Sequence, residues 1–272
     1  MPALIFDCDG VLADTERFGH LPAFNETFAA FGLPVHWSDE EYARRLLIGG
    51  GKERMASMLT PEFVAANHLP TDGAGQRKML ADWHRHKTAT YTAMVAAGAM
   101  PGRPGIARIV REAAAAGWQL AVASTSAEAS VRAVLDHAIG ADRAKDFAIF
   151  TGDVVPAKKP DPAIYELALK ELGTPPNQVV VVEDSANGLR AALGAGLACV
   201  VTVSAYTVDE DFTGAALVVS SLGDSDGEQS MLLADPYDVR PGGVVDLDDL
   251  TRLLGMAHPG TPAAAGPPPG HE

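Results

Sequence analysis

The sequence predicts an α/β protein, with a Rossmann-like, doubly wound parallel sheet and an inserted all-helical domain. Three observations lead to this fold class. Four runs rich in Val, Ile, Leu and Ala, at residues 3–8, 118–123, 178–183 and 198–203, lack polar alternation, which is typical of strands buried on both faces. Helical patterns lie between these runs. Residues 15–97 have helical periodicity with no buried strand, which indicates an insertion.

The helices of the core are expected where glycine or proline marks their ends. The patterns at residues 104–117, 127–139, 161–172 and 186–195 each end at or just before a glycine, and Pro162 suits a first helical turn. Their alternation with the strands implies right-handed crossovers between parallel strands.

The order of these elements predicts a core domain that is interrupted once. We expect residues 1–14 and 98–256 to form the α/β core and residues 15–97 to form a helical cap domain. The Gly/Pro-rich segment 98–105 would be the hinge between them.

The C-terminal region is acidic. From Ser204 onward the chain has 12 acidic and 2 basic residues, a net charge of −10 out of −14 for the whole chain. A last helix is expected at residues 244–254, with Asp246 or Asp248 as its cap. Residues 257–272, rich in Pro, Gly and Ala, are expected to form a disordered tail.

Charge and hydropathy exclude several classes of protein. The net charge of −14 argues against a nucleic-acid partner, and no apolar run is long enough for a membrane span. The N-terminus lacks the features of a signal peptide, so we expect a cytoplasmic protein, either a monomer or a weak homo-oligomer. Cys8 and Cys199 lie in strand-like runs, where buried reduced thiols are more common than a disulfide or a zinc site.

Polar and charged residues follow the predicted strands at the end where ligands bind in an open parallel sheet. Carboxylates that converge there repel one another unless a cation or a bound proton relieves the repulsion. Oxygen ligands with open positions suit Mg²⁺, and a lysine with a hydroxyl group beside the metal would form an anion site that suits phosphate. The residues concerned are Asp7, Asp9, Ser124, Thr125, Ser126, Lys158, Lys159, Glu183 and Asp184.

Each of these motifs also has a purely structural interpretation. Asp-x-Asp-Gly is a common turn sequence. Thr125 or Ser126 would serve as a helix cap, a role compatible with phosphate binding by Ser124. Glu183 and Asp184 would equally serve to cap the helix that follows them.

The motifs together resemble those of a known family. "DCDGV", the hydroxyl that closes "AVAS", the lysine before proline in "KKPDP", and "VEDSANG" resemble, in this order, the four motifs of the haloacid dehalogenase superfamily. The resemblance is to its sugar-phosphatase and mutase branch. The insertion after the first motif is similar to the helical cap of that branch.

The resemblance implies an aspartyl-phosphate mechanism. Asp7 would attack phosphorus, while Asp9 would protonate the leaving alcohol and later deprotonate water, with its backbone carbonyl reaching Mg²⁺. Asp7 and Asp184 would bind the metal directly, with Glu183 nearby.

Two further residues would stabilise the transferring group. Ser124 would donate a hydrogen bond to a phosphoryl oxygen, and Lys159 would neutralise charge. Lys158 is the rival of Lys159, but Lys159 directly precedes Pro160, as in the family. Thr125 is a candidate for binding the substrate.

"GGKER", "DTER" and "AFNETF" resemble the CbbY-like branch, of which some members act on xylulose 1,5-bisphosphate. We therefore expect substrate contacts from Glu16, His20, Lys52 and Arg54, with Lys52 on a flexible glycine-rich loop. The alternative is a helix whose first turn carries solvated charges, and His20 would equally suit a core position. Phe18, Leu21 and Pro22 replace the more polar pattern of the branch.

The sequence thus predicts a Mg²⁺-dependent phosphatase that acts on a phosphorylated sugar, with xylulose 1,5-bisphosphate as the candidate. The alternatives are a mutase of the β-phosphoglucomutase type and a catalytically idle phosphosugar-binding module. The motifs do not separate phosphatase from mutase, because the two differ in whether water or a bound sugar attacks the aspartyl phosphate. A dehalogenase would leave the acids at 183 and 184 without a role.

Overall fold

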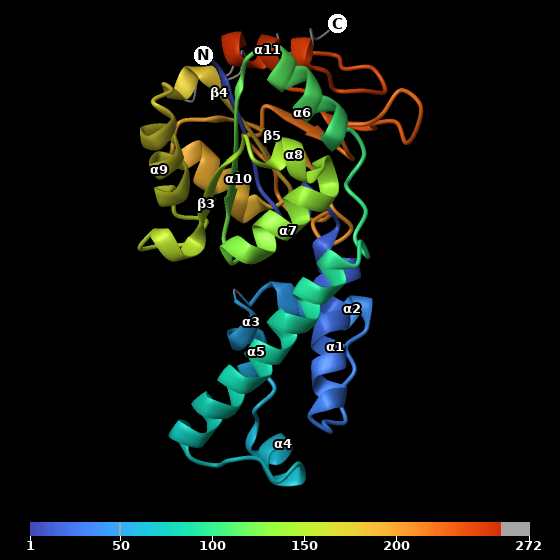
Figure 1. Cartoon of the computed structure of the whole chain (residues 1–272), viewed down its shortest axis with the longest axis vertical. Helices are drawn as coiled ribbons and strands as arrows, with labels where there is room; N and C mark the ends of the chain where they lie inside the picture. The colour runs from blue at the N-terminus through green and yellow to red at the C-terminus, as the bar shows by residue number, and fades with distance from the viewer. Residues whose placement is uncertain (49, 257–272) are drawn as a thin grey trace, which may run out of the picture. The chain divides into compact units, whose positions relative to one another are not determined.

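The computed structural model describes residues 1–48 and 50–256 (Figure 1). The tail expected at residues 257–272 lies outside the described residues.

The chain divides into two compact units, which we call the core unit and the cap unit. The core unit consists of Met1–Ala13 and Pro101–Glu272, and the cap unit of Asp14–Met100. From the sequence we expected the boundaries between residues 14 and 15 and between residues 97 and 98, and the structure places them between 13 and 14 and between 100 and 101.

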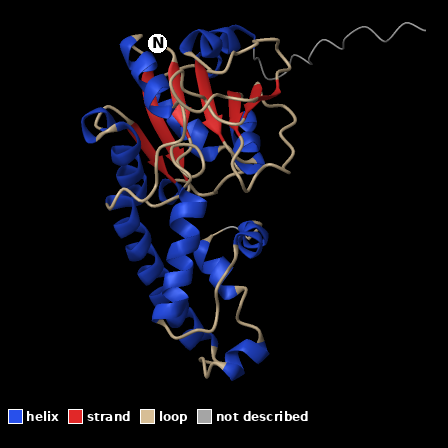
Figure 2. Cartoon of the chain, turned by 90° about the vertical axis from the view of Figure 1, so that its right-hand side faces the viewer, coloured by secondary structure: helices blue, strands red, loops and turns tan. Residues whose placement is uncertain are grey.

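The core unit contains a seven-stranded sheet in the order β3-β2-β1-β4-β5-β6-β7, drawn in red in Figure 2. All neighbouring strands are parallel except β6 and β7, which are antiparallel. The strands are β1 (Ala3–Phe6), β2 (Gln119–Ser124), β3 (Ala148–Thr151), β4 (Val179–Glu183), β5 (Ala198–Thr202), β6 (Leu217–Val219) and β7 (Leu232–Ala234).

Four of these strands, β1, β2, β4 and β5, correspond to the apolar runs of the sequence. The expectation of an entirely parallel sheet of these strands was incomplete, because β3, β6 and β7 extend the sheet at both sides. β6 and β7 have only three residues each, and all residues of β7 are exposed. Short or exposed strands lack the buried apolar pattern by which the others were predicted.

Helices cover both faces of the sheet. On one face α9 (Ala163–Leu172) and α10 (Ala186–Gly194) pack against alternate strand residues such as Ile5 and Val181. On the other, α6 (Ile106–Ala115) packs against β2 and α11 (Leu247–Met256) against β4. The remaining helices of the core are α7 (Glu128–Ile139), α8 (Ala141–Ala144) and the 3-10 turns η2 (Gly152–Val154) and η3 (Pro176–Gln178).

The register of the central strands brings their carboxyl ends level. Phe6 of β1 lies opposite Val122 of β2 and Val182 of β4. The backbone N–H of Asp7 donates to the carbonyl of Val182 at 2.9 Å, so the β1–β4 ladder continues to Asp7. The side chains that follow β1, β2 and β4 therefore start from one edge of the sheet.

In the part of the chain that the structure describes, every regular element of the cap unit is a helix. Four aromatic side chains form its centre: Phe24 lies 5.0 Å and Phe28 4.7 Å from Trp37 between ring centroids, and Trp37 lies 6.1 Å from Tyr42. Asn25 fastens this cluster by two hydrogen bonds to the backbone of Trp37, at 2.8 and 3.0 Å. The cap elements are η1 (Glu16–His20), α1 (Leu21–Ala30), α2 (Asp39–Leu46), α3 (Gly51–Ala56), α4 (Pro61–Ala66) and α5 (Gly73–Ala96).

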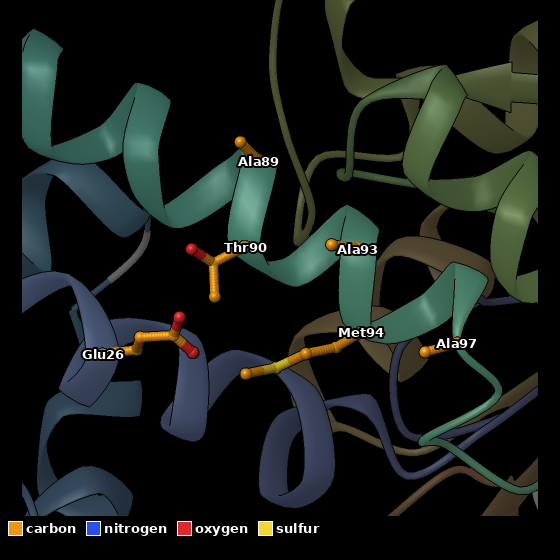
Figure 3. Close-up of a pocket in the computed structure, with 6 residues that line it drawn as sticks. All are labelled: Glu26, Ala89, Thr90, Ala93, Met94 and Ala97. Atoms are coloured by element: carbon orange, nitrogen blue, oxygen red, sulfur yellow. The ribbon is translucent and has the colours of Figure 1, made fainter.

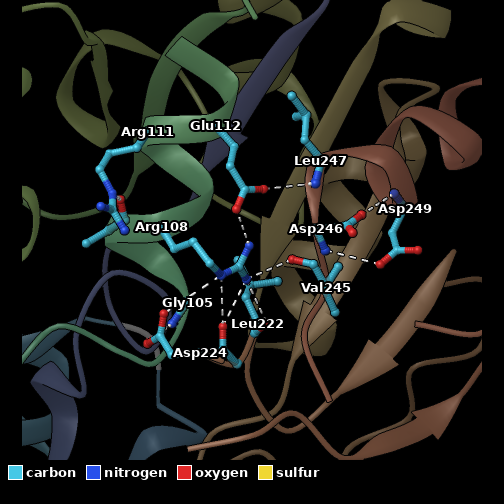
Figure 4. A network of polar contacts seen from close by, with 12 residues as sticks. Gly105, Arg108, Arg111, Glu112, Leu222, Asp224, Val245, Asp246, Leu247 and Asp249 are labelled. Atoms are coloured by element: carbon cyan, nitrogen blue, oxygen red, sulfur yellow. Dashed lines mark hydrogen bonds and ion pairs between the residues drawn. The ribbon is translucent and has the colours of Figure 1, made fainter. Parts of the chain in front are cut away.

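Arg108 of α6 ties the C-terminal region to the core unit (Figure 4). Its guanidinium donates to the backbone carbonyls of Leu222, Gly223 and Val245 at 2.9–3.2 Å. It also pairs with Glu112 one turn further along α6, at 2.9 Å. The arginine side chain is only 12% exposed, so these contacts are largely shielded from water.

The start of α11 is capped by two side chains. The Asp246 carboxylate accepts from the N–H of Asp249 at 2.9 Å, and Asp249 accepts from the N–H of Asp246 at 3.1 Å. This reciprocal pair is a capping box, so Asp246, and not Asp248, is the cap. Glu112 adds a contact by accepting from the N–H of Leu247 at 3.1 Å.

We predict that Arg108→Met lowers the free energy of unfolding by about 3 kcal/mol, because three buried carbonyls lose a charged donor. Arg111→Met is the matched control, since Arg111 lies exposed on the same helix and, among the described residues, its side chain bonds only to Ala107 of that helix. Urea unfolding of both variants measures the difference. Equal losses in the two variants would show that the Arg108 contacts contribute no net stability.

Candidate active site

Three buried carboxylates meet at the carboxyl end of the sheet. Asp7 follows β1, Glu183 is the last residue of β4, and Asp184 comes directly after it. One oxygen from each of the three lies within 4.8 Å of the others. Because β1 and β4 are adjacent and in register, the convergence expected from the sequence is present in the structure.

Lys159 supplies the positive charge nearest to these acids. Its ammonium group donates to Asp7 Oδ1 at 2.6 Å, to Glu183 Oε1 at 2.6 Å and to the carbonyl of Ala123 at 2.8 Å. These three bonds use all its hydrogens. Lys158, the rival in the sequence, is exposed, so the structure brings Lys159 and not Lys158 to the acids.

Tyr165 of α9 also belongs to the site, although the sequence analysis missed it. Its hydroxyl donates to Glu183 Oε1, and its ring centre lies 5.1 Å from the ammonium nitrogen of Lys159. No local pattern distinguishes this tyrosine from an ordinary buried aromatic residue of an amphipathic helix.

Two glycines make room for the carboxyl groups, because they lack a Cβ. Gly10 has φ +76°, and a Cβ there would overlap the carboxyl group of Asp184. A Cβ at Gly188, in the first turn of α10, would overlap the carboxyl group of Glu183. Both glycines belong to the motifs "DCDG" and "SANG", so their role is close packing around the acids.

The cluster has more acidic than basic side chains, and burial together with these charges shifts their pKa values. Burial raises the pKa of Asp7 to about 7, with Glu183 and Asp9 acting in the same direction and Lys159 opposing them. Burial, then Asp7 and Glu183, hold the pKa of Asp184 well above its usual range. For Lys159, burial alone would lower the pKa, but Asp7 and Glu183 outweigh it and raise the value.

This donor set fits a divalent cation. Asp7, Glu183 and Asp184 offer only carboxylate oxygens, which are the ligands of hard cations such as Mg²⁺. Three carboxylates beside one ammonium leave an excess of negative charge that a divalent cation would offset. Asp9, which the sequence also placed at the metal, is not one of this group of three side chains.

Asp9 is held from the side of β2 instead. Its carboxylate Oδ2 accepts from the hydroxyl of Ser126 at 2.5 Å. Ser124, the last residue of β2, is buried, and its hydroxyl accepts from the N–H of Ser126 at 3.1 Å. Thr125 between them is exposed.

The capping alternatives weighed for these motifs do not occur. The residue before α7 is Ala127, with no side-chain cap, so neither Thr125 nor Ser126 caps that helix. Ser185 caps α10 by accepting from the N–H of Gly188 at 3.2 Å. The acids at the end of β4 are therefore not used as helix caps.

Arg103 fixes the backbone around the site, and the sequence analysis missed it too. Its guanidinium donates to the carbonyls of Gly10, Thr202, Val203 and Ser220, the last three at 3.0, 2.8 and 2.5 Å. It thus joins the loop after β1 to the ends of β5 and β6. The sequence showed only a Gly/Pro-rich segment here, because contacts to distant carbonyls leave no local signal.

In the cap unit, Glu16 and Arg54 are part of one polar network. Tyr42 donates its hydroxyl to Glu16 at 2.5 Å, and Arg54 donates to the same hydroxyl at 3.2 Å. Arg54 also donates to the carbonyl of Ile48 at 3.0 Å. Lys52 lies exposed in the first turn of α3, so the expectation of a flexible loop around it was wrong.

A second cap cluster surrounds His20. Its ring stacks on Tyr91 with centroids 4.1 Å apart, and its Nδ1 lies 2.5 Å from the ammonium nitrogen of Lys87. Lys87 is buried, and the sequence did not single it out among the residues of a long helix. Burial, then the charges of Lys87 and Lys52, lower the pKa of the neighbouring His84, while Glu53 acts in the opposite direction.

The cap unit also has an open groove of about 480 Å³ between α1 and α5 (Figure 3). Apart from Thr90 and Glu26 its lining is apolar, consisting of Ala89, Ala93, Met94 and Ala97. It lacks the clustered acids and cations found at the carboxyl end of the sheet. We therefore take the acid cluster, and not this groove, as the candidate active site.

The comparisons with known proteins agree with this geometry. The model of the haloacid dehalogenase-like hydrolase family matches residues 1–196. A CBBY-like protein of Arabidopsis thaliana is 46% identical over 227 residues, which cover 84% of this chain and 71% of that protein.

Two solved structures are similar as well. A mutant of CbbY from Rhodobacter sphaeroides, in complex with xylulose-(1,5)bisphosphate, is 44% identical with a TM-score of 0.68, covering 81% of this chain and 95% of that one. A putative beta-phosphoglucomutase from Thermotoga maritima is 26% identical with a TM-score of 0.56, covering 75% and 87%. In the described residues no helix is long and apolar enough to cross a membrane. By its acid cluster and by these similarities, the chain belongs to the haloacid dehalogenase-like hydrolase family, as a CbbY-like phosphatase.

Proposed function

We propose that the chain is a Mg²⁺-dependent phosphatase that hydrolyses a phosphorylated sugar, with xylulose 1,5-bisphosphate as the candidate substrate. The observation that carries the proposal is the convergence of Asp7, Glu183 and Asp184 around a single lysine. The candidate substrate is the ligand of the CbbY structure to which the chain is similar.

Asp7 is the nucleophile in this proposal. Its carboxylate oxygen attacks phosphorus, the bond from phosphorus to the sugar oxygen breaks, and an aspartyl phosphate results. Water then attacks the aspartyl phosphate, which releases inorganic phosphate and regenerates the carboxylate. The contact of Lys159 with Asp7 at 2.6 Å orients the nucleophile and balances charge on the transferring group.

Asp9 is the general acid and base. It gives its proton to the departing sugar oxygen in the first step and takes one from the attacking water in the second. Ser124, buried at the end of β2, donates a hydrogen bond to a phosphoryl oxygen. Thr125 is exposed next to it, and we keep it as a candidate for contact with the substrate.

The carboxylates of Asp7, Glu183 and Asp184 would hold the metal, together with the backbone carbonyl of Asp9. When bound, Mg²⁺ would offset charge on the phosphoryl oxygens and help to orient the phosphate. Glu183 Oε1 is already engaged by Lys159 and Tyr165, so its role is to position this ammonium as much as to bind the cation.

The cap unit has cations that suit a substrate with a second phosphate. Lys87 is buried against His20, and Lys52 and Arg54 lie on the short helix α3. Glu16, which is hydrogen-bonded by Tyr42, is the residue of this set that suits a sugar hydroxyl.

A mutase of the β-phosphoglucomutase type is the second candidate. A similar structure bears that name, and a mutase shares the acids and the lysine. A catalytically idle phosphosugar-binding module is disfavoured, because Asp7 and Lys159 are present and in contact. We further propose a cytoplasmic protein, a monomer or a weak homo-oligomer, that binds neither nucleic acid nor membranes.

We predict Mg²⁺-dependent phosphate release, abolished by EDTA, with the largest kcat/KM for xylulose 1,5-bisphosphate. The comparison substrates are ribulose 1,5-bisphosphate, fructose 1,6-bisphosphate and β-glucose 1-phosphate. Release from all four without preference would contradict the named substrate but not the phosphatase. Conversion of β-glucose 1-phosphate to glucose 6-phosphate without phosphate release would favour the mutase instead.

We predict that Asp7→Asn lowers kcat by more than about 10³-fold, because an amide cannot form the aspartyl phosphate. The variant should stay folded, since it is nearly the same size and reduces the charge excess of the cluster. Phosphate release and circular dichroism measure the two properties. Near-normal turnover by Asp7→Asn would contradict the assignment of the nucleophile.

We predict that, in EDTA, the stability contributed by Asp7 falls as pH rises from about 4 to about 7. Its pKa is about 7 in the folded protein against an ordinary 3.8. The folded state therefore binds more protons in this range, and the loss is at most about 4 kcal/mol. Urea unfolding of the wild type and of Asp7→Asn at several pH values isolates this contribution. A difference between the two that does not change with pH would contradict it.

A further inference from the structure

Ser126 has no role in the mechanism described above, but its contact with Asp9 suggests one. We propose that Ser126 is a positioning residue that holds the carboxyl group of Asp9 for protonation of the leaving group. This inference rests on the proposed function, in which Asp9 is the general acid. It starts from the hydrogen bond of Ser126 Oγ to Asp9 Oδ2 at 2.5 Å, across 117 positions of the chain.

Ser126 is itself held in place. Its N–H donates to the hydroxyl of Ser124 at 3.1 Å, and Ser124 is buried at the end of β2. The helix that follows takes no side-chain cap from Ser126, although serine is a preferred cap residue. The hydroxyl is therefore directed to Asp9 and not to the backbone of α7.

The backbone of Asp9 is fixed separately, so the role left for Ser126 concerns the side chain. The N–H of Gly10 donates to the carbonyl of Ala13 at 3.0 Å, and Arg103 donates to the carbonyl of Gly10. The carboxyl group still rotates about its own side-chain bonds unless a partner fixes it. Ser126, in the segment that follows the neighbouring strand β2, provides such a partner.

A hydroxyl group suits a residue that gains and loses a proton in each turnover. It donates to the carboxylate form of Asp9 and accepts from the carboxylic acid form, so one contact serves both. A lysine or an arginine in this position would donate only and would favour the carboxylate. The structure thus pairs the proposed acid with a partner that is compatible with both of its forms.

The test compares substrates whose leaving groups differ in their need for a proton. The aliphatic probe is whichever of the four sugar phosphates named above has the highest kcat/KM, and the aryl probe is p-nitrophenyl phosphate. A sugar alkoxide needs protonation to leave, whereas p-nitrophenolate leaves without it. The quantity measured is kcat/KM, which covers the steps up to formation of the aspartyl phosphate.

We expect Ser126→Ala to lower kcat/KM for the sugar phosphate by about tenfold or more, and for p-nitrophenyl phosphate by less than about twofold. Ser126→Thr keeps a hydroxyl and should recover most of the lost rate. Ser130→Ala is the matched control, because it removes the hydroxyl of a buried serine of α7 that has no part in the proposed mechanism, and it should change neither value by more than about twofold. In an Asp9→Asn background, Ser126→Ala should cause little further loss.

Equal losses on both probes in Ser126→Ala, or no loss on either, would overturn the positioning role. If Ser126→Ala does not fold, Ser126→Cys, which keeps the size of the side chain but is only a weak donor, replaces it. A larger loss for the sugar phosphate than for p-nitrophenyl phosphate would then support the role, and equal losses would overturn it. Failure of the wild type to release phosphate from every probe would instead contradict the proposed function itself.

Discussion

The core site depends on the balance between three buried carboxylates and one buried ammonium group. Lys159 contacts Asp7 and Glu183 directly, and no hydrogen of its ammonium group is left for another partner. The raised pKa values of Asp7 and Asp184 show the consequence, which is a cluster that favours added positive charge. Protons and a divalent cation would compete for the same oxygens. The cost of burying these acids would therefore favour the binding of a cation.

Sheet topology brings the charges together, and small backbone features determine how closely they approach. Parallel β1 and β4 in register place Asp7 beside Glu183. A Cβ at Gly10 would overlap the carboxyl group of Asp184, and a Cβ at Gly188 would overlap that of Glu183. Glycine at these two positions therefore leaves room for the carboxyl groups. A side chain at either glycine would therefore disturb the acids without touching the residues that react.

The residues that could be predicted from the sequence are those whose position relative to an apolar strand is local. Asp7 and Glu183 follow or end such strands, so one edge of a parallel sheet had to unite them. Lys159 lies in a loop, where its position before Pro160 favoured it over Lys158, and its contacts with Asp7 and Glu183 agree with that choice. Tyr165 and Arg103 act through contacts made across 18 to 117 positions of the chain, and such contacts leave no periodic pattern. The core motifs were thus predictable, but the residues that hold them in place were not.

In the proposed mechanism, the order β2-β1-β4 places two tasks on opposite sides of β1. Glu183 and Asp184 approach Asp7 from the β4 side, where a cation would keep the carboxylates ionised. Ser126 contacts Asp9 from the β2 side, and Asp9 is not one of the three clustered carboxylates. In the proposed mechanism Asp9 gives and takes a proton, whereas the three clustered carboxylates would hold a cation. Two aspartates separated by one residue can therefore act differently, because their neighbours come from opposite strands.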